Sequence, residues 1–181
     1  MTLLHPSLMP APSLMPAPSL MPATSGALTP VELLELVQTI AADRATWLAR
    51  VEHHADRRWF AQVRATGRYD AWLIGWSTEQ GVDLHDHGGS SGALCVLDGE
   101  LVEVAPSLPG ASDPAALTET RLVAGDARAF GRHHVHAVTN QAPHPATSLH
   151  VYSPPLRTMD FYAPAPGSGL VPVAHDDGST W

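Results

Sequence analysis

From residue 69 onward, turn-forming residues divide the chain into many short apolar segments, and this pattern limits the fold more than any other feature. The 17 prolines and 14 glycines among the 181 residues suit short strands joined by tight turns. Short, closely spaced segments favour an antiparallel jelly-roll barrel, so we expect a mainly β protein. Asp98-Gly99 predicts a hairpin turn, because glycine there supplies a positive φ. The expected strands are 71–76, 82–87, 93–97, 101–104, 119–123, 127–130, 134–139, 147–152 and 158–162.

A helical segment precedes the expected strands. Thr29-Pro30-Val31-Glu32 fits a helix start, with Thr29 as N-cap, Pro30 in the first turn and Glu32 completing a capping box. Asp43 is placed to cap a second helix that carries Trp47. We therefore expect about 30 residues of helix, in short pieces, before the barrel.

The first residues carry a repeat. The hexapeptide Ser-Leu-Met-Pro-Ala-Pro occurs at 7–12 and 13–18 and, with a final threonine, at 19–24. Prolines at this frequency oppose both helix and sheet. We expect residues 1–28 to form a disordered, Pro-rich tail without a part in the chemistry, and 29–181 to form a single domain.

The charge of the chain excludes several function classes. The formal net charge is −8, and all ten basic residues are arginine. A negative chain without a basic run does not favour binding to nucleic acid or to an anionic membrane. The absence of lysine also excludes lysine Schiff-base chemistry.

The cellular setting follows from the cysteine count and from the segments the sequence lacks. Cys95 is the one cysteine, so no internal disulfide forms, which suits a reducing compartment. No apolar run reaches the ~20 residues of a membrane span, and no basic region opens a signal peptide. We expect a cytoplasmic monomer.

Histidines concentrate in the strand region. His85 and His87 stand two residues apart, a spacing that directs both imidazoles of a strand to one face. His134 and His136 share a face in the same way. Either pair alone is compatible with core or surface histidines, but two such pairs in one barrel favour a metal site. Strand parity does not decide between His134 and His136.

These motifs resemble the cupin superfamily. Where many cupins carry a glutamate ligand after the first histidine pair, this chain has 88–92, Gly-Gly-Ser-Ser-Gly, without a carboxylate. That departure resembles the thiol dioxygenase branch, the cysteine dioxygenase type I family. The resemblance implies that His85, His87 and His136 hold Fe(2+). The matching positions are Gly81, His85, His87, Gly99, His136 and Asn140.

A polar strip follows on a later strand. Ser148, His150 and Tyr152 alternate along the chain and therefore face the same way. They can pass a hydrogen bond from serine to histidine to the tyrosine hydroxyl. With Ser153-Pro154, this stretch resembles the cysteine dioxygenase segment that carries a catalytic relay and a cis Ser-Pro bond. A solvated polar strand face is the alternative.

Two departures bear on the active site. Gly92 matches the position of the cysteine that is joined to the relay tyrosine in mammalian members, so we expect no crosslink. Gln62 stands where the family's carboxylate-binding arginine is expected, and a glutamine there resembles the 3-mercaptopropionate dioxygenases. We expect Gln62 and Arg64 to bind the substrate, with Arg58 as another possible source of the positive charge.

The resemblance implies a reaction in which O2 oxidises a small thiol, with L-cysteine becoming cysteine sulfinate. Three neutral ligands leave a divalent ion its +2 charge, which favours thiolate binding. A three-histidine site also suits zinc, so a non-redox isomerase or lyase is an alternative that the polar strip argues against. We expect Asn140 or a backbone carbonyl to hydrogen-bond a ligand imidazole.

Overall fold

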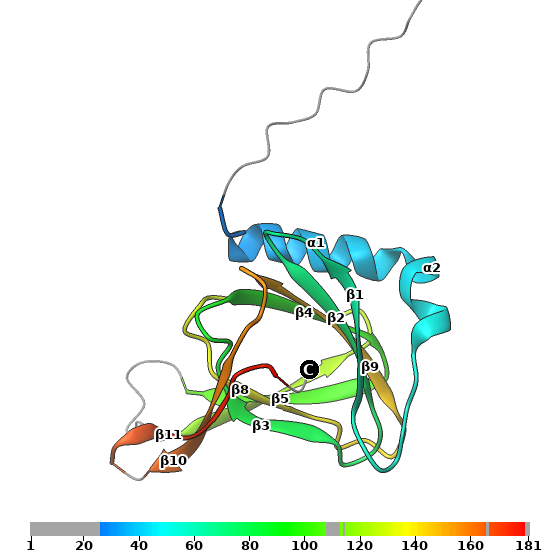
Figure 1. Ribbon diagram of the computed structural model, residues 1–181. Coiled ribbons are helices and arrows are strands. Elements are labelled where there is room, and N and C mark those ends of the chain that lie inside the picture. Colours follow the sequence, from blue (N-terminus) through cyan, green and yellow to red (C-terminus); the bar gives the residue numbers. More distant parts are fainter. Residues whose placement is uncertain (1–25, 108–112, 114, 166, 180–181) are drawn as a thin grey trace, which may run out of the picture.

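Two antiparallel sheets face each other and enclose the interior of the protein (Figure 1). The computed structural model describes residues 26–107, 113, 115–165 and 167–179. The protein is mainly β, with 49% strand and 14% helix, which confirms the expected fold class. Among the described residues, no helix is long and apolar enough to cross a membrane. The repeat at 7–24 lies outside the described residues.

The strand order alternates between the sheets in the manner of a jelly roll. Within the described residues, one sheet comprises, in spatial order, β1 (Trp59–Ala65), β2 (Asp70–Trp76), β9 (Ala146–Ser153), β4 (Ser91–Asp98) and β7 (Ala127–Phe130). The other comprises β11 (Gly169–Asp176), β10 (Met159–Ala165), β3 (Gly81–His85), β8 (His136–Thr139), β5 (Glu100–Pro106) and β6 (Leu117–Val123).

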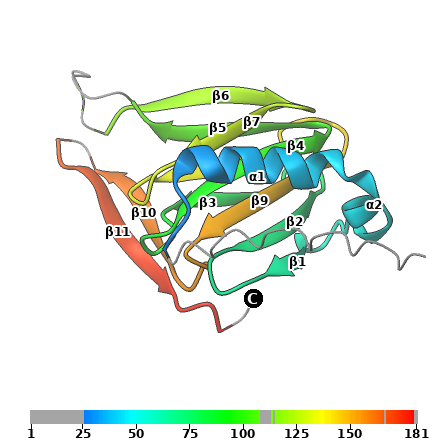
Figure 2. The same ribbon diagram turned by 90° about the horizontal axis from the view of Figure 1, so that it is seen from above.

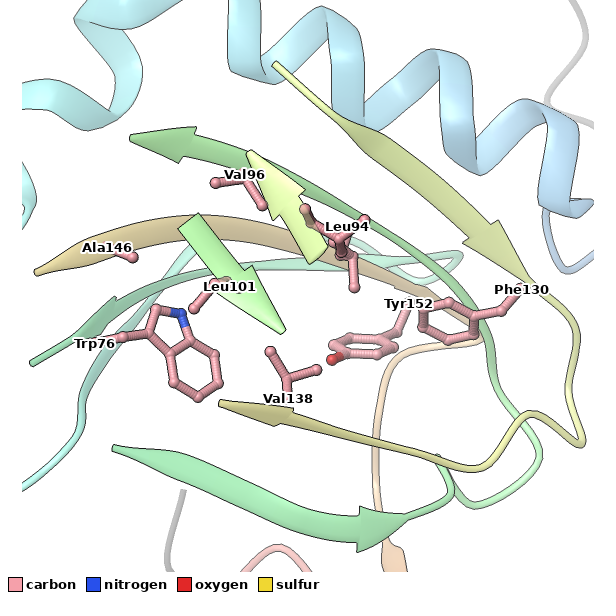
Figure 3. Close-up of a cluster of buried hydrophobic side chains, with 9 residues drawn as sticks. Trp76, Leu94, Val96, Leu101, Phe130, Val138, Ala146 and Tyr152 are labelled. Atoms are coloured by element: carbon pink, nitrogen blue, oxygen red, sulfur yellow. The ribbon is translucent and has the colours of Figure 1, made fainter. Parts of the chain in front are cut away.

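The central strand β9 is covered on both faces, and every one of its residues is buried. Its outward side chains, Leu149 and Val151, pack with α1 (Pro30–Ala42), which lies across the outside of this sheet (Figure 2). Its inward side includes Tyr152, which belongs to a second apolar cluster between the two sheets (Figure 3). Alternation along β9 therefore sends Ser148, His150 and Tyr152 into the barrel.

The helix start is as the sequence predicts. The side chain of Thr29 accepts a hydrogen bond from the Glu32 amide, Glu32 bonds back to the Thr29 amide, and Pro30 is the first helical residue. The second helix is much shorter than expected: α2 (Arg44–Trp47) continues only into the 3₁₀ turn η1 (Leu48–Arg50). The Asp43 side chain makes no capping bond to the α2 backbone, so little supports a longer helix.

Two edge strands are missing from the sequence prediction. Within the part of the chain that the structure describes, β1 pairs only with β2, and β11 only with β10. β11 contains Pro172, which argues against an inner strand but is tolerated at a sheet edge.

The predicted hairpin at Asp98-Gly99 is wrong, although the positive φ is correct. Gly99 has φ 73°, but β4 pairs with β7 and β9, whereas β5 pairs with β6 and β8. The turn therefore carries the chain from one sheet to the other. A Cβ on Gly99 would lie 2.7 Å from the Pro145 carbonyl oxygen, so the close approach also requires glycine.

Candidate metal centre and active site

Three histidines, from β3, from the segment that follows it and from β8, converge inside the barrel. His85 ends β3 and lies opposite His136, the first residue of β8, while His87 follows two residues after His85. The ring centroids are 5.0 Å apart for each of the three pairs, and one ligand nitrogen from each ring lies within 4.8 Å of the others. The structure thus brings His85, His87 and His136 together, whereas His134 stands behind His136, hydrogen-bonded to Glu103.

Hydrogen bonds fix which nitrogen two of these rings present to the centre. His85 Nδ1 lies 2.8 Å from the Asp83 carbonyl oxygen, and His136 Nδ1 lies 2.8 Å from Glu103 Oε1. Both partners are acceptors only, so each Nδ1 carries the proton. The lone pair of each ring is therefore on Nε2, which is the tautomer needed for metal binding.

The protonation state of the rings also suits a metal. Burial lowers the pKa of His85 to about 3 and lowers the pKa of His87 and His136, so the rings are neutral near pH 7. Neither nitrogen of His87 has a hydrogen-bond partner, although the side chain is 1% exposed. A buried polar atom without a partner is costly, and a cation shared with the other two rings would satisfy one of these nitrogens. The donor set fits a divalent transition metal.

Glu103 lies directly beside the three-histidine cluster, and the sequence reasoning missed it. This β5 side chain is 3% exposed, and besides His136 its carboxylate accepts from Arg128 Nη1 at 2.7 Å and contacts His134 Nε2 at 3.3 Å. Burial acts to raise the pKa of Glu103, but these hydrogen bonds outweigh it and hold the pKa below its usual range. A negative charge therefore lies directly behind a ligand ring, on its Nδ1 side.

Of the two expected hydrogen-bond partners for the clustered imidazoles, Asn140 or a backbone carbonyl, the structure shows the carbonyl. A backbone carbonyl does orient His85. Asn140 instead donates to the carbonyl oxygens of Trp76 and His144, so its amide supports the loop after β8 rather than a ligand imidazole.

The polar strip on β9 forms a continuous hydrogen-bonded chain that begins at Trp76. The indole Nε1 donates to Ser148 Oγ at 2.8 Å, Ser148 Oγ lies 2.8 Å from His150 Nε2, and His150 Nδ1 lies 3.2 Å from the Tyr152 hydroxyl. Because the indole can only donate, the serine hydroxyl proton is available for His150 Nε2.

The direction of this chain determines what Tyr152 can do. Burial lowers the pKa of His150 to about 3, so the ring is neutral and its one proton sits on Nδ1, donated to the tyrosine oxygen. Burial and nearby Asp70 raise the pKa of Tyr152, which keeps its hydroxyl proton. That proton is then free to be donated into the cavity that the side chain lines.

A cavity of about 80 Å³ opens beside the cluster of three histidines. Arg58 lines it and is the one charged side chain among its walls as the described residues form them, and no wall residue is acidic. The guanidinium donates to the Gly81 carbonyl at 2.9 Å and lies 5.4 Å from the ring centroid of Trp76, while its Nε is buried without a partner. The other walls are Phe60, Trp72, Ile74, Trp76, Val82, His85, His136, Val138, His150, Tyr152, Leu156 and Met159.

The expected substrate-binding residues Gln62 and Arg64 are placed elsewhere. Both side chains are exposed on β1, and neither lines the cavity. Arg58, which directly precedes β1, lines the cavity beside the three histidines instead. Charged residues surround Arg58 in the sequence, and this pattern does not predict that the barrel covers much of its guanidinium.

The residues that bear on a crosslink lie on opposite faces of β4. Gly92 is opposite Tyr152 across β4 and β9, whereas Cys95 packs in the cluster beneath α1. The peptide bond Ser153-Pro154 is cis, as the resemblance implies.

Comparisons with known proteins agree with this architecture. A family model described as cysteine dioxygenase type I matches residues 24–164. The solved structure of TT1209 from Thermus thermophilus is 24% identical, covering 60% of this chain and 94% of that chain with a TM-score of 0.50. A cupin superfamily protein from Desulfitobacterium hafniense is 14% identical over 60% of this chain and 87% of that one, with a TM-score of 0.49. These structural likenesses concern the cupin fold alone. No curated protein matches the chain.

Proposed function

Because the chain belongs to the cysteine dioxygenase type I family, we propose that it is an iron(II)-dependent thiol dioxygenase that converts L-cysteine to cysteine sulfinate. The observation that carries this proposal is the cluster of three neutral imidazoles, His85, His87 and His136, beside a cavity that holds a tyrosine hydroxyl and an arginine. In the net reaction, both atoms of O2 are added to the thiol sulfur. No other reductant is required, because the sulfur supplies the electrons.

His85, His87 and His136 would hold the iron. A ferrous ion there supplies the centre at which the thiol and O2 are brought together and electrons leave the sulfur. The imidazoles add no negative charge to the cation, so a thiolate is favoured over a neutral thiol. The apolar walls, which include Val82, Val138 and Leu156, restrict water around the reacting groups.

Two polar side chains would orient the substrate. The Arg58 guanidinium lines the cavity and has the charge to bind the substrate carboxylate. The Tyr152 hydroxyl, held by His150, donates a hydrogen bond into the same cavity. A thiol with a carboxylate on a short carbon chain can contact both groups while its sulfur faces the three histidines.

A second candidate substrate is 3-mercaptopropionate. Among the described residues, the cavity walls include no carboxylate that could accept hydrogen bonds from a substrate ammonium. For cysteine, the amine would therefore have to be bound at the metal. 3-Mercaptopropionate lacks the amine and therefore needs no partner for it.

Oxygen uptake after anaerobic loading with ferrous iron tests the proposal. We expect stoichiometric O2 consumption and sulfinate formation with cysteine, and the same assay with 3-mercaptopropionate ranks the two substrates by kcat/KM. A higher kcat/KM for 3-mercaptopropionate than for cysteine would make 3-mercaptopropionate the substrate. Iron-loaded protein that consumes no O2 with either thiol would refute the dioxygenase proposal and would favour a non-redox metal enzyme.

A further inference from the structure

One of the three proposed metal ligands lacks the hydrogen bond that orients the other two. The Asp83 carbonyl holds His85, and Glu103 holds His136. His87 follows the end of β3, and neither of its ring nitrogens has a partner. Since a metal ligand needs a defined ring orientation, packing must do for His87 what hydrogen bonds do for the other two.

Phe130, the last residue of β7, provides the nearest ring contact of His87, and the Tyr152 ring lies further away, with its centroid 5.2 Å from that of His87. The Phe130 ring is stacked on His87, with the centroids 4.7 Å apart and the planes 26° from parallel. The same ring lies 5.2 Å from the His136 ring and stacks on His134 at 4.9 Å. Tyr152 lies one strand further on, on β9 beyond β4. Its ring lies beside that of Phe130 (Figure 3), and the two ring centroids are 6.4 Å apart. Phe130 thus lies against rings of both the three-histidine cluster and the polar strip on β9.

Gly92 makes room for this ring. It is the β4 residue opposite both Phe130 on β7 and Tyr152 on β9. A Cβ on Gly92 would lie 2.5 Å from two atoms of the Phe130 ring and 3.0 Å from Tyr152 Cδ1. The phenyl ring therefore occupies the space that any side chain at position 92 would need, and its present orientation depends on glycine there.

We propose that Phe130 is a positioning residue that sets the orientation of His87 as a metal ligand, and that Gly92 is required because it admits the Phe130 ring. The inference rests on the proposed metal centre and adds a device to it. Hydrogen bonds orient two ligands, and an aromatic ring seated over a glycine orients the third.

Titration with Co²⁺, followed by the visible absorption of the bound ion, tests the role of Phe130 apart from turnover. We expect Phe130→Leu to weaken Co²⁺ binding about 10-fold or more, the range found when groups that support metal ligands are removed, and to alter the absorption spectrum. Leu122→Ala is the matched control, because Leu122 belongs to the same buried cluster but lies on β6. It should lower the Tm and leave Co²⁺ affinity within about twofold of wild type.

The glycine gives an independent arm. Gly92→Ala should also weaken Co²⁺ binding, because the Phe130 ring must move, and the double variant with Phe130→Leu should bind no more weakly than Phe130→Leu alone. A Phe130→Leu variant with the Co²⁺ affinity and spectrum of wild type would overturn the inference. If Phe130→Leu does not fold, the same result in Gly92→Ala would overturn it. Additive losses of Co²⁺ affinity in the double variant would also overturn it. A wild-type protein that binds no Co²⁺ or Fe²⁺ would instead refute the metal centre and with it the role of Phe130.

Discussion

Replacing Glu103 by glutamine removes one buried negative charge and changes the volume of the side chain very little. The carboxylate lies 2.8 Å from His136 Nδ1 and 2.7 Å from Arg128 Nη1, and it is 3% exposed. Glutamine can still accept a hydrogen bond from His136. That bond would join two neutral groups and would no longer draw the imidazole proton toward a carboxylate.

The size of the effect follows from the type of bond that is lost. A hydrogen bond to a charged group contributes about 1.5–3 kcal/mol, against about 1 kcal/mol for a neutral one. The difference, about 0.5–2 kcal/mol, corresponds to metal binding weaker by about 2–30-fold. The ferric form carries more charge than the ferrous form, so losing the carboxylate should also raise the Fe(III)/Fe(II) potential.

Ferrous titration under anaerobic conditions measures the affinity, and redox titration of the loaded protein measures the potential. Glu100→Gln is the matched control, because it makes the same charge change on the same strand. Glu100 pairs with Arg121 near the surface, where an ion pair contributes about 0–1 kcal/mol. Equal affinities and equal potentials in the two variants would refute the reasoning that Glu103 acts on the metal through His136.

Three further predictions address the cavity and the buried histidines. Tyr152→Phe should keep the metal affinity of wild type and lower kcat about 100-fold, the lower range for a positioned proton donor; a rate equal to that of the control Tyr69→Phe would contradict this. Arg58→Met should raise KM for a thiol carboxylate about 10-fold or more, since a charge-assisted bond is lost, whereas Arg64→Met should not, and the opposite order in steady-state assays would restore Arg64 to the site. Burial lowers the pKa of His150 to about 3, while an unfolded histidine titrates at about 6.5. As the pH falls below about 6.5, the unfolded chain therefore binds the proton first, and the metal-free protein should lose about 1.4 kcal/mol of unfolding free energy per pH unit for this ring. Urea unfolding at several pH values should give a shallower slope for His150→Asn, and an unchanged slope would contradict the neutral assignment.

Local pattern was enough to predict the parts of the site that lie along single strands. The spacing of His85 and His87 and the alternation of Ser148, His150 and Tyr152 each follow from the two-residue period of a strand. The capping box at Thr29 is likewise local. The choice of His136 over His134 needed the resemblance, because strand parity gives both the same face.

Residues that strand pairing brings to the site could not be predicted from the local sequence pattern. Glu103 reaches His136 because β5 and β8 are neighbours, and the sequence does not state that pairing. Its one local signal is that Glu103 shares the inward parity of Leu101, which marks a carboxylate facing the core. Arg58 precedes an edge strand, and its place in the cavity depends on packing against Trp76.

The coordination sphere of the ferrous protein tests the central claim most directly. X-ray absorption and pulsed EPR of the nitric oxide adduct would count and identify the protein ligands. The proposed function predicts one iron per chain bound by three imidazole nitrogens, from His85, His87 and His136, and by no protein carboxylate. A carboxylate ligand such as Glu103, fewer than three imidazoles, or undiminished binding in His85→Ala would contradict it.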